Sequence, residues 1–411
     1  MKIIAGGITA AKGFEAAGVA AGVKYQDRKD MALIYSQTPC SVAGTFTRNV
    51  VKAAPVLWDQ AIVEAAAAVH AVVVNSGIAN ACTGKEGMAH CTLTAQETAA
   101  ALGIHEQEVL VASTGVIGMK LPMDKIRVGI HTLAKQKEAG RLAADAAANA
   151  IMTTDTHAKQ AAVSFEIDGV TVTVGGMCKG SGMIHPDMCT MLAFVTTDIA
   201  ISRDLLVKAV QEDVPDTFNM ISVDGDTSTN DTLLVLANGM AGNRQITEED
   251  KGYLKFKEAL RAVNETLAKM MAGDGEGATA LFEVIVSGAK TKEDARKLSK
   301  SVICSSLTKA AIFGHDANWG RILCALGYSG AAFDPAQVEV SFCGQSERKG
   351  VSIPIYRNGE GCDFNEEEAT EILSQPHVTV LVNMNMGEET ATAWGCDLTY
   401  DYVRINADYR S

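Results

Sequence analysis

The sequence lacks the residue spacings of common metal and redox sites. Its ten cysteines include no C-x-x-C pair, and its eight histidines include no H-x-x-x-H or H-E-x-x-H spacing. Zinc sites and disulfide frameworks depend on such clusters. Most of the cysteines stand in apolar stretches such as SVICSSL and RILCALG, so we expect reduced thiols that pack as small buried groups. We therefore expect no metal and no redox cofactor.

Long apolar runs and an excess of positive charge are also missing. The stretch AIVEAAAAVHAVVV is interrupted by Glu64 and His70, so it does not predict a membrane-spanning helix. The opening residues, MKIIAGGITAAKGF, lack the apolar core of a signal peptide. The 49 acidic residues outnumber the 36 Lys and Arg, and the net charge of −13 disfavours binding to nucleic acid or to a membrane surface. These features predict a cytoplasmic protein.

The glycine-rich and acidic loops do not match the common nucleotide or calcium motifs. GDGEGATA (273–280) lacks the Lys-Ser/Thr ending of a P-loop, and GGMCKGSG (175–182) fits neither G-x-G-x-x-G nor Walker A. VDGDTSTND (223–231) is rich in acids that could hold calcium, but it lacks the full EF-hand spacing. We interpret it as a polar turn before the strand TLLVLANG.

The sequence does contain enough apolar residues for a large core, at 47% of 411 residues with 21% charged. Strand-like and helix-like segments alternate, which predicts an α/β or α+β fold. The strongest turn signal is Asp168-Gly169, between two β-branched runs of a predicted hairpin over 163–177. Further strands are predicted in 68–77, 105–118, 190–198, 280–289, 337–344 and 377–384. Helices are predicted in 87–103, 123–150 (one or two helices), 248–275, 291–302, 318–330 and 365–376.

The stretch PDMCTMLAF (186–194) places Cys189 and Thr190 where a loop enters an apolar segment. Threonine is common in strands, so this pair is compatible with an ordinary strand start. Thr190 could instead be a nucleophile, if cutting of the Cys189–Thr190 bond made its own α-amine available as a base. Cys189 could also be the reactive group, although no neighbour in the sequence lowers the pKa of its thiol convincingly. The nine residues alone leave these alternatives open.

Two other stretches offer groups that such chemistry needs. In ASTGVIG (112–118), the Thr114 hydroxyl and the unobstructed N–H of Gly115 could stabilise an oxyanion. In CKGSGMI (178–184), Lys179 offers a cation for a carboxylate. Each signal is weak alone, because Ser-Thr-Gly is usually a turn and a single lysine is usually solvated.

The order of these stretches is more specific than any one of them. Together they resemble the ornithine acetyltransferase family, also called bifunctional glutamate N-acetyltransferases. The resemblance covers essentially the whole chain and is carried by NSGIANACTG (75–84), ASTGVIG (112–118), IMTTDT (151–156), CKGSGMIHPDMCTMLAF (178–194), GDGEGATAL (273–281), GHDANWGRI (314–322) and the ending YVRINADYRS.

This resemblance implies a layered α/β/β/α sandwich like that of N-terminal-nucleophile enzymes, with a smaller C-terminal α/β region. It implies autoproteolysis between Cys189 and Thr190, giving an α chain of residues 1–189 and a β chain of residues 190–411. Many family members carry alanine before the threonine. Because cysteine is also small and the attacked carbonyl is unchanged, we expect the cut to survive here.

The resemblance also assigns roles to residues. Thr190 is the implied acetyl-accepting nucleophile, and Thr114 and Gly115 form the implied oxyanion hole. The implied substrate-contacting positions are Thr156, Lys179, Thr190, Glu276, Asn406 and Ser411. In TTDT (153–156), the resemblance favours Thr156 over Thr154. Glu276 suits the ammonium group of an amino acid, and Lys179 suits its carboxylate.

The implied reaction moves an acetyl group from N2-acetyl-L-ornithine to L-glutamate in a cytoplasmic assembly of two α and two β chains. No residue decides whether acetyl-CoA is a further donor. Two rival functions remain open on the sequence. One is a self-processing aminopeptidase or amidase, in which water accepts the acyl group, and the other is a non-catalytic binding protein.

Overall fold

The computed structural model describes residues 1–185, 191–344 and 352–407, and these residues form two compact units. Unit 1 contains residues 1–180, 191–219 and 227–267. Unit 2 contains residues 181–185, 220–226 and the described residues from 268 onward. The predicted positions Cys189, Thr190 and Ser411 lie outside the described residues.

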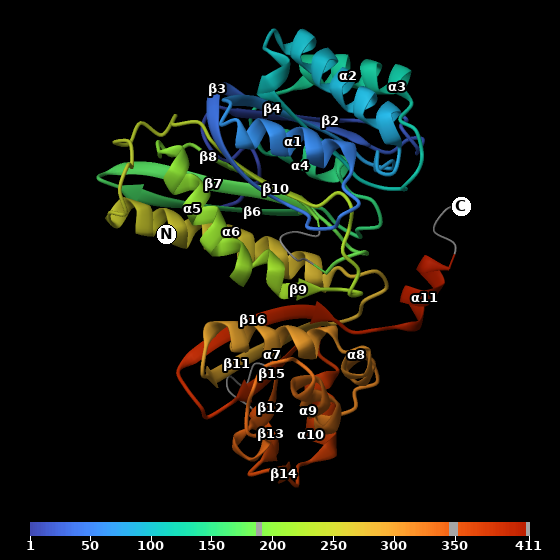
Figure 1. The fold of residues 1–411 in the computed structure, drawn as a ribbon, viewed down its shortest axis with the longest axis vertical. Coiled ribbons are helices and arrows are strands. Elements are labelled where there is room, and N and C mark those ends of the chain that lie inside the picture. Colours follow the sequence, from blue (N-terminus) through green and yellow to red (C-terminus); the bar gives the residue numbers. More distant parts are fainter. Residues whose placement is uncertain (186–190, 345–351, 408–411) are drawn as a thin grey trace. The chain divides into compact units, whose positions relative to one another are not determined.

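Unit 1 is built on strands that lie in the order β1-β6-β7-β8-β10-β3-β4-β5, with β2 paired to β3 (Figure 1). Among the described residues these strands are β1 (Lys2–Ile3), β2 (Phe14–Val19), β3 (Met31–Phe46), β4 (Val69–Asn75), β5 (Val109–Ser113), β6 (Lys159–Ile167), β7 (Val170–Lys179), β8 (Leu192–Thr197) and β10 (Thr232–Ala237). The helices that accompany them are α1 (Ala54–Glu64), α2 (Gly84–Leu102), α3 (Met123–Gln136), α4 (Arg141–Ala150), α5 (Arg203–Asp213) and α6 (Lys251–Gly273), whose last residues belong to unit 2.

The side chains of β4 show how unit 1 is layered. Val72 and Val74 belong to a buried cluster with Phe194 of β8 and Leu234 of β10, so they lie between two layers of strands. Val73 belongs to a second cluster, with residues of α2 and α3, on the opposite face. Because successive strand residues point to opposite faces, the run AVVV is buried on both sides.

A second helical layer covers the other strands. A Cβ on Gly176 of β7 would lie 3.0 Å from Leu267 and 3.2 Å from Val263, both on α6. The order of layers in unit 1 is therefore helix, sheet, sheet, helix, as predicted.

The predicted hairpin over 163–177 is confirmed as β6 and β7. Its two central residues, Asp168 and Gly169, have φ angles of 49° and 80°. Both residues therefore lie in the left-handed region that a two-residue turn with matching twist requires. The pairing continues to Cys178 opposite Lys159, which brings Lys179 to the end of β7.

Unit 2 contains a mixed sheet in the order β14-β13-β12-β15-β11-β16-β9. Its described strands are β9 (Ile221–Ser222), β11 (Leu281–Ala289), β12 (Glu339–Gly344), β13 (Ser352–Arg357), β14 (Glu360–Gly361), β15 (His377–Asn383) and β16 (Glu389–Cys396). Its helices are α7 (Lys292–Cys304), α8 (Ser306–Phe313), α9 (Trp319–Gly327), α10 (Glu366–Leu373) and α11 (Tyr400–Asn406). α7 packs on β16 and β11.

The elements predicted from sequence are found, and the stretch 123–150, predicted as one or two helices, forms two, because Gly140 has a φ of 100° between α3 and α4. Several elements were not predicted, among them the long strand β3, which contains Pro39, and the helices α1, α5 and α8. The expectation that the thiols are buried is wrong for Cys82 and Cys324, which are exposed.

None of the described helices is both long enough and apolar enough to span a bilayer.

A buried acid in unit 2 gives a prediction about stability at low pH. Glu283 of β11 accepts hydrogen bonds from Trp394 Nε1 at 2.6 Å and Thr379 Oγ1 at 3.2 Å, and His377 Nε2 lies 3.3 Å away. Burial alone would raise the pKa of Glu283, but the contacts with His377, Trp394 and Lys269 lower it to about 2. Its stabilising effect is therefore complete above the unfolded-state pKa and is lost as the pH falls towards 2.

We expect the free energy of unfolding of unit 2 to fall by about 2–3 kcal/mol between pH 5 and pH 2 through this group. Glu283→Gln should lower stability at pH 7 and flatten this acid-dependent loss, as followed by tryptophan fluorescence during urea unfolding. The control is Glu293→Gln, because Glu293 is 73% exposed in its pair with Lys297. An unchanged pH profile in Glu283→Gln would contradict the assignment.

Candidate active site

The predicted oxyanion residues follow the end of β5. β4 and β5 are parallel, with Asn75 opposite Ser113, so both strands end at the same edge. Beyond that edge Thr114 N donates to Asn75 O at 3.0 Å, and Val116 N donates to Gly77 O at 3.1 Å. Ser113 Oγ also donates to Asn75 Oδ1 at 2.7 Å. The Thr114–Gly115 turn is thus held by the preceding strand and loop.

Gly115 cannot carry a side chain in this turn. Its φ is 128°, and a Cβ would lie 2.2 Å from the carbonyl carbon of Gly77 and 2.4 Å from its oxygen. The backbone contact with Gly77 therefore requires glycine at this position, independently of any role of its N–H in chemistry.

Lys179 is brought to Thr114 by the end of β7. Its side chain is 7% exposed, and Nζ donates to Thr114 Oγ1 at 3.3 Å. A threonine hydroxyl that accepts a hydrogen bond still has its own hydrogen to donate. Lys179 therefore places a positive charge behind a hydroxyl that can face a developing oxyanion. In the strand register Lys179 lies opposite Leu192 of β8, two positions after Thr190 in the chain.

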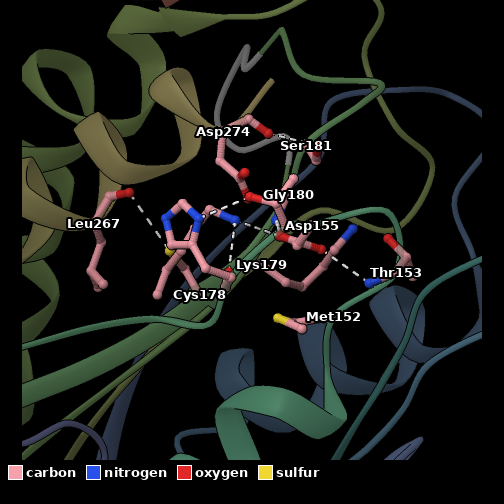
Figure 2. Close-up of polar contacts among 12 residues, drawn as sticks. Met152, Thr153, Asp155, Cys178, Lys179, Gly180, Ser181, Leu267 and Asp274 are labelled. Carbon is pink, nitrogen blue, oxygen red and sulfur yellow. Dashed lines mark hydrogen bonds and ion pairs between the residues drawn. The ribbon is translucent and has the colours of Figure 1, made fainter. Parts of the chain in front are cut away.

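Asp155 supplies a fixed negative charge next to Lys179 (Figure 2). It accepts hydrogen bonds from Thr153 N at 3.0 Å, Gly180 N at 2.7 Å and the buried Lys159 Nζ at 2.7 Å. Burial alone would raise the pKa of Asp155, but the charges of Lys179 and Lys159 and these hydrogen bonds lower it to about 2. Asp155 is therefore ionised at neutral pH.

Asp155 was missed by the sequence analysis, which selected Thr156 from the same stretch. Thr156 is exposed, and its Oγ1 lies 3.0 Å from His157 Nδ1. Its predicted role in substrate binding is untested and stays a prediction. The sequence does contain a signal for Asp155. This acid stands four residues before Lys159, the first residue of a strand, and that spacing could have suggested an ion pair.

The loop before β10 was interpreted as a polar turn, but its end is buried. Asn230 Nδ2 donates to Ala79 O at 2.6 Å and to Ser113 O at 2.8 Å, which ties this loop to the turn that holds Thr114. Asp231 is 2% exposed. Burial raises the pKa of Asp231 well above its usual range, and hydrogen bonds from Ser228 and Met191 and the charge of Lys179 offset this only in part. Asp155 and Asp231 therefore favour opposite protonation states beside the same lysine.

Unit 2 brings together two of the other predicted site residues. Glu276 is 6% exposed, and Asn406 Nδ2 of α11 donates to its Oε2 at 2.7 Å. Glu276 N donates to Ser181 O at 2.9 Å, and a Cβ on Gly182 would lie 2.4 Å from the Glu276 carboxyl carbon. The motifs CKGSG and GDGEG thus meet through Ser181, Gly182 and Glu276.

The predicted site residues are therefore found in two groups. Thr114, Gly115 and Lys179 lie in unit 1, and Glu276 and Asn406 lie in unit 2. Among the described residues, no three histidine, cysteine or acidic side chains gather as a metal site.

Solved structures with similarity to this chain include an arginine biosynthesis protein and an ornithine acetyltransferase. The arginine biosynthesis bifunctional protein argJ of Bacillus halodurans is 46% identical, with a TM-score of 0.49, and the match covers 52% of this chain and 97% of that one. The ornithine acetyltransferase of Mycobacterium tuberculosis, solved with ornithine, is 42% identical, with a TM-score of 0.41, and the match covers 45% and 98%.

Sequence relatives cover the chain far more completely. The arginine biosynthesis bifunctional protein ArgJ 1 of Clostridium acetobutylicum is 52% identical, and the match covers 97% of this chain and 96% of that protein. The ArgJ protein of Symbiobacterium thermophilum is 52% identical over the full length of both chains. The profile of the ArgJ family matches residues 15–411. The chain therefore belongs to the ArgJ family and is a glutamate N-acetyltransferase of arginine biosynthesis.

Proposed function

We propose that this acetyltransferase works through a covalent acetyl-Thr190 intermediate, formed after the chain cuts itself between Cys189 and Thr190. The observation that carries the proposal is the contact between Lys179 Nζ and Thr114 Oγ1, next to Gly115 and opposite the start of β8. The contact places the positive charge of Lys179 and the hydroxyl donor of Thr114 near Leu192, which follows Thr190 by two positions. It supports an acyl-transfer site in which Thr114 and Gly115 stabilise the oxyanion.

In the proposed cut, Thr190 Oγ attacks the carbonyl carbon of Cys189. The carbon–nitrogen bond breaks, an ester forms on Thr190, and the Thr190 nitrogen becomes a free amine. Water then opens the ester and leaves a carboxylate on Cys189. The threonine emerges with its hydroxyl and an α-amine that can act as its base.

In the proposed transfer, Thr190 Oγ attacks the acetyl carbonyl of N2-acetyl-L-ornithine. The Thr114 hydroxyl and the Gly115 N–H donate to the oxyanion, and Lys179 strengthens the hydroxyl as a donor. L-ornithine leaves with its amine, and the amine of L-glutamate then takes the acetyl group from Thr190. The product is N-acetyl-L-glutamate, and Thr190 is regenerated.

The proposed substrate contacts include the carboxylate of Glu276, held by Asn406. A buried carboxylate suits the ammonium group that ornithine carries. The sequence predicts that Lys179 binds a substrate carboxylate. Its contact with Thr114 instead favours a position beside the acetyl group that is transferred. Thr156 and Ser411 remain further proposed contacts.

We further propose a cytoplasmic assembly of two α and two β chains that needs no metal or redox cofactor. The relatives' names call them bifunctional, which supports acetyl-CoA as a second acetyl donor for glutamate.

Thr190→Ala should remain one full-length band on a denaturing gel and should not form acetylglutamate, because it lacks the attacking hydroxyl. Cys189→Ala is the matched control and should still be cut and still transfer acetyl. If the cysteine variant alone lost cutting, Cys189 would be the reactive group instead.

Thr114→Val keeps the shape of threonine but removes the hydroxyl. We expect kcat/KM for acetyl transfer to fall by roughly 10²–10³, which is typical for the loss of one oxyanion donor. Thr114→Ser retains the hydroxyl and should stay within about tenfold of the wild type. Similar losses in both variants would argue against a role for this hydroxyl.

The acceptor is tested with N2-acetyl-L-ornithine in the presence and absence of L-glutamate. We expect ornithine release to depend on glutamate and to equal the acetylglutamate formed. Equal release without glutamate would instead indicate the hydrolase. A parallel assay with acetyl-CoA and glutamate should yield acetylglutamate if acetyl-CoA is the second donor.

A further inference from the structure

Self-cutting poses a proton-transfer problem that the mature enzyme does not have. In the mature enzyme the α-amine of Thr190 can accept the hydroxyl proton. Before the cut, that nitrogen is part of an amide and is no base. It must also gain a proton when its bond to Cys189 breaks. The uncut chain therefore needs another group that can give and accept a proton near this nitrogen, and the inference below rests on the proposed self-cutting.

Asp231 directly precedes β10, the strand that pairs with β8. Thr232 N donates to Met191 O at 2.8 Å, and Thr232 lies opposite Leu192 in the parallel register of β10 and β8. The carboxyl group of Asp231 in turn receives a hydrogen bond from the backbone of Met191. The nitrogen that must be protonated belongs to Thr190, the residue directly before Met191.

One oxygen of Asp231 has no evident structural use. Oδ2 is buried and has no hydrogen-bond partner among the residues that the structure describes. An unsatisfied buried polar atom lowers stability and requires an explanation. A proton-transfer role would explain it, because the partner of Oδ2 would then be the reacting group.

The contrast with Asp155 supports a neutral acid at this position. Asp155 is surrounded by Lys159, Lys179 and two backbone N–H groups, which stabilise its anion. Burial dominates at Asp231 and favours its protonated form. When the surroundings drive two neighbouring carboxyl groups towards opposite states, they commonly have different chemical tasks.

We propose that Asp231 is the proton-transfer residue of the self-cutting reaction. As Thr190 Oγ bonds to the Cys189 carbonyl carbon, Asp231 gives its carboxyl proton to the Thr190 nitrogen and the carbon–nitrogen bond breaks. The proton of the Thr190 hydroxyl returns to Asp231. One amide and one hydroxyl thus become one ester and one amine, and Asp231 ends as it began.

The main test is Asp231→Asn, which keeps the size of the side chain and its neutral charge but removes the transferable proton. The full chain is made by cell-free translation with labelled methionine, and the loss of the uncut band is followed on denaturing gels. We expect the rate of cutting to fall by roughly 10²–10⁴, the usual contribution of general acid–base catalysis. A rate within threefold of the wild type would overturn the proposal.

Asp59 provides a matched control. Asp59 of α1 is also fully buried, its Oδ1 accepts from Val111 N at 2.8 Å, and its Oδ2 also has no partner among the described residues. Burial likewise raises the pKa of Asp59 well above its usual range. Asp59→Asn should therefore perturb folding to a similar extent and should cut at the wild-type rate. Equal slowing in both variants would mean that the loss at Asp231 is structural.

Hydroxylamine tests whether the ester on Thr190 forms. It cleaves esters and leaves ordinary amides intact, so it cuts the chain only where the ester has formed. If Asp231 is needed to form the ester, hydroxylamine should not restore cutting in Asp231→Asn. Restoration to the wild-type rate would show that the ester forms without Asp231 and would overturn the proposal.

A second pair of variants covers the case in which Asp231→Asn does not fold. Asp231→Glu and Asp231→Gln add the same methylene group, but only glutamate can transfer a proton. Faster cutting in the Glu variant than in the Gln variant supports the proposal, and equal rates overturn it. An uncut wild-type chain that also fails to transfer acetyl would instead overturn the proposed function itself.

Discussion

The arrangement around Thr114 in unit 1 depends on the burial of the positive charge of Lys179. The ammonium group of Lys179 lies at the end of β7 with little access to water, and such a group needs nearby negative or polar partners. Asp155 provides the negative charge, and it accepts hydrogen bonds from Thr153 N in its own loop and from Gly180 N, directly after the lysine. Lys159 and Lys179 both lower the pKa of Asp155, whereas burial raises the pKa of Asp231. A lysine beside Thr114 is the kind of charge that stabilises a developing oxyanion.

The buried contacts around Thr114 also orient the polar groups that take part in the proposed reaction. Thr114 is held by the ends of two parallel strands, and Asn230 ties the adjoining carbonyl of Ser113 to the loop before β10. These contacts use backbone groups that would otherwise be unsatisfied at the strand ends. The polar groups are therefore oriented before substrate arrives, so little reorganisation is needed during the reaction.

Many elements of the fold could be predicted from local pattern, because period-two alternation, the Asp168-Gly169 turn and glycine helix ends are local signals. The strand β3 was missed because Pro39 lies within it, and the register shift between Tyr35 and Cys40 that accommodates it is a tertiary feature. In the site, the motif order identified Thr114, Gly115 and Lys179. Asp231 was missed because a polar run before an apolar strand usually lies in solvent. Only the contacts of Asn230 with residues more than 100 positions away reveal that this one is buried.

The strand order has a consequence for the two pieces that self-cutting would produce. β8 and β10 follow the Cys189–Thr190 bond in sequence, yet they lie between β7 and β3, which precede it. Six residue pairs join β8 to β7, and six join β10 to β3. Separation of the pieces would break both ladders and open the buried cluster between the layers. Dilution alone would not separate them, so the mature enzyme would behave as one folding unit with an extra pair of chain ends.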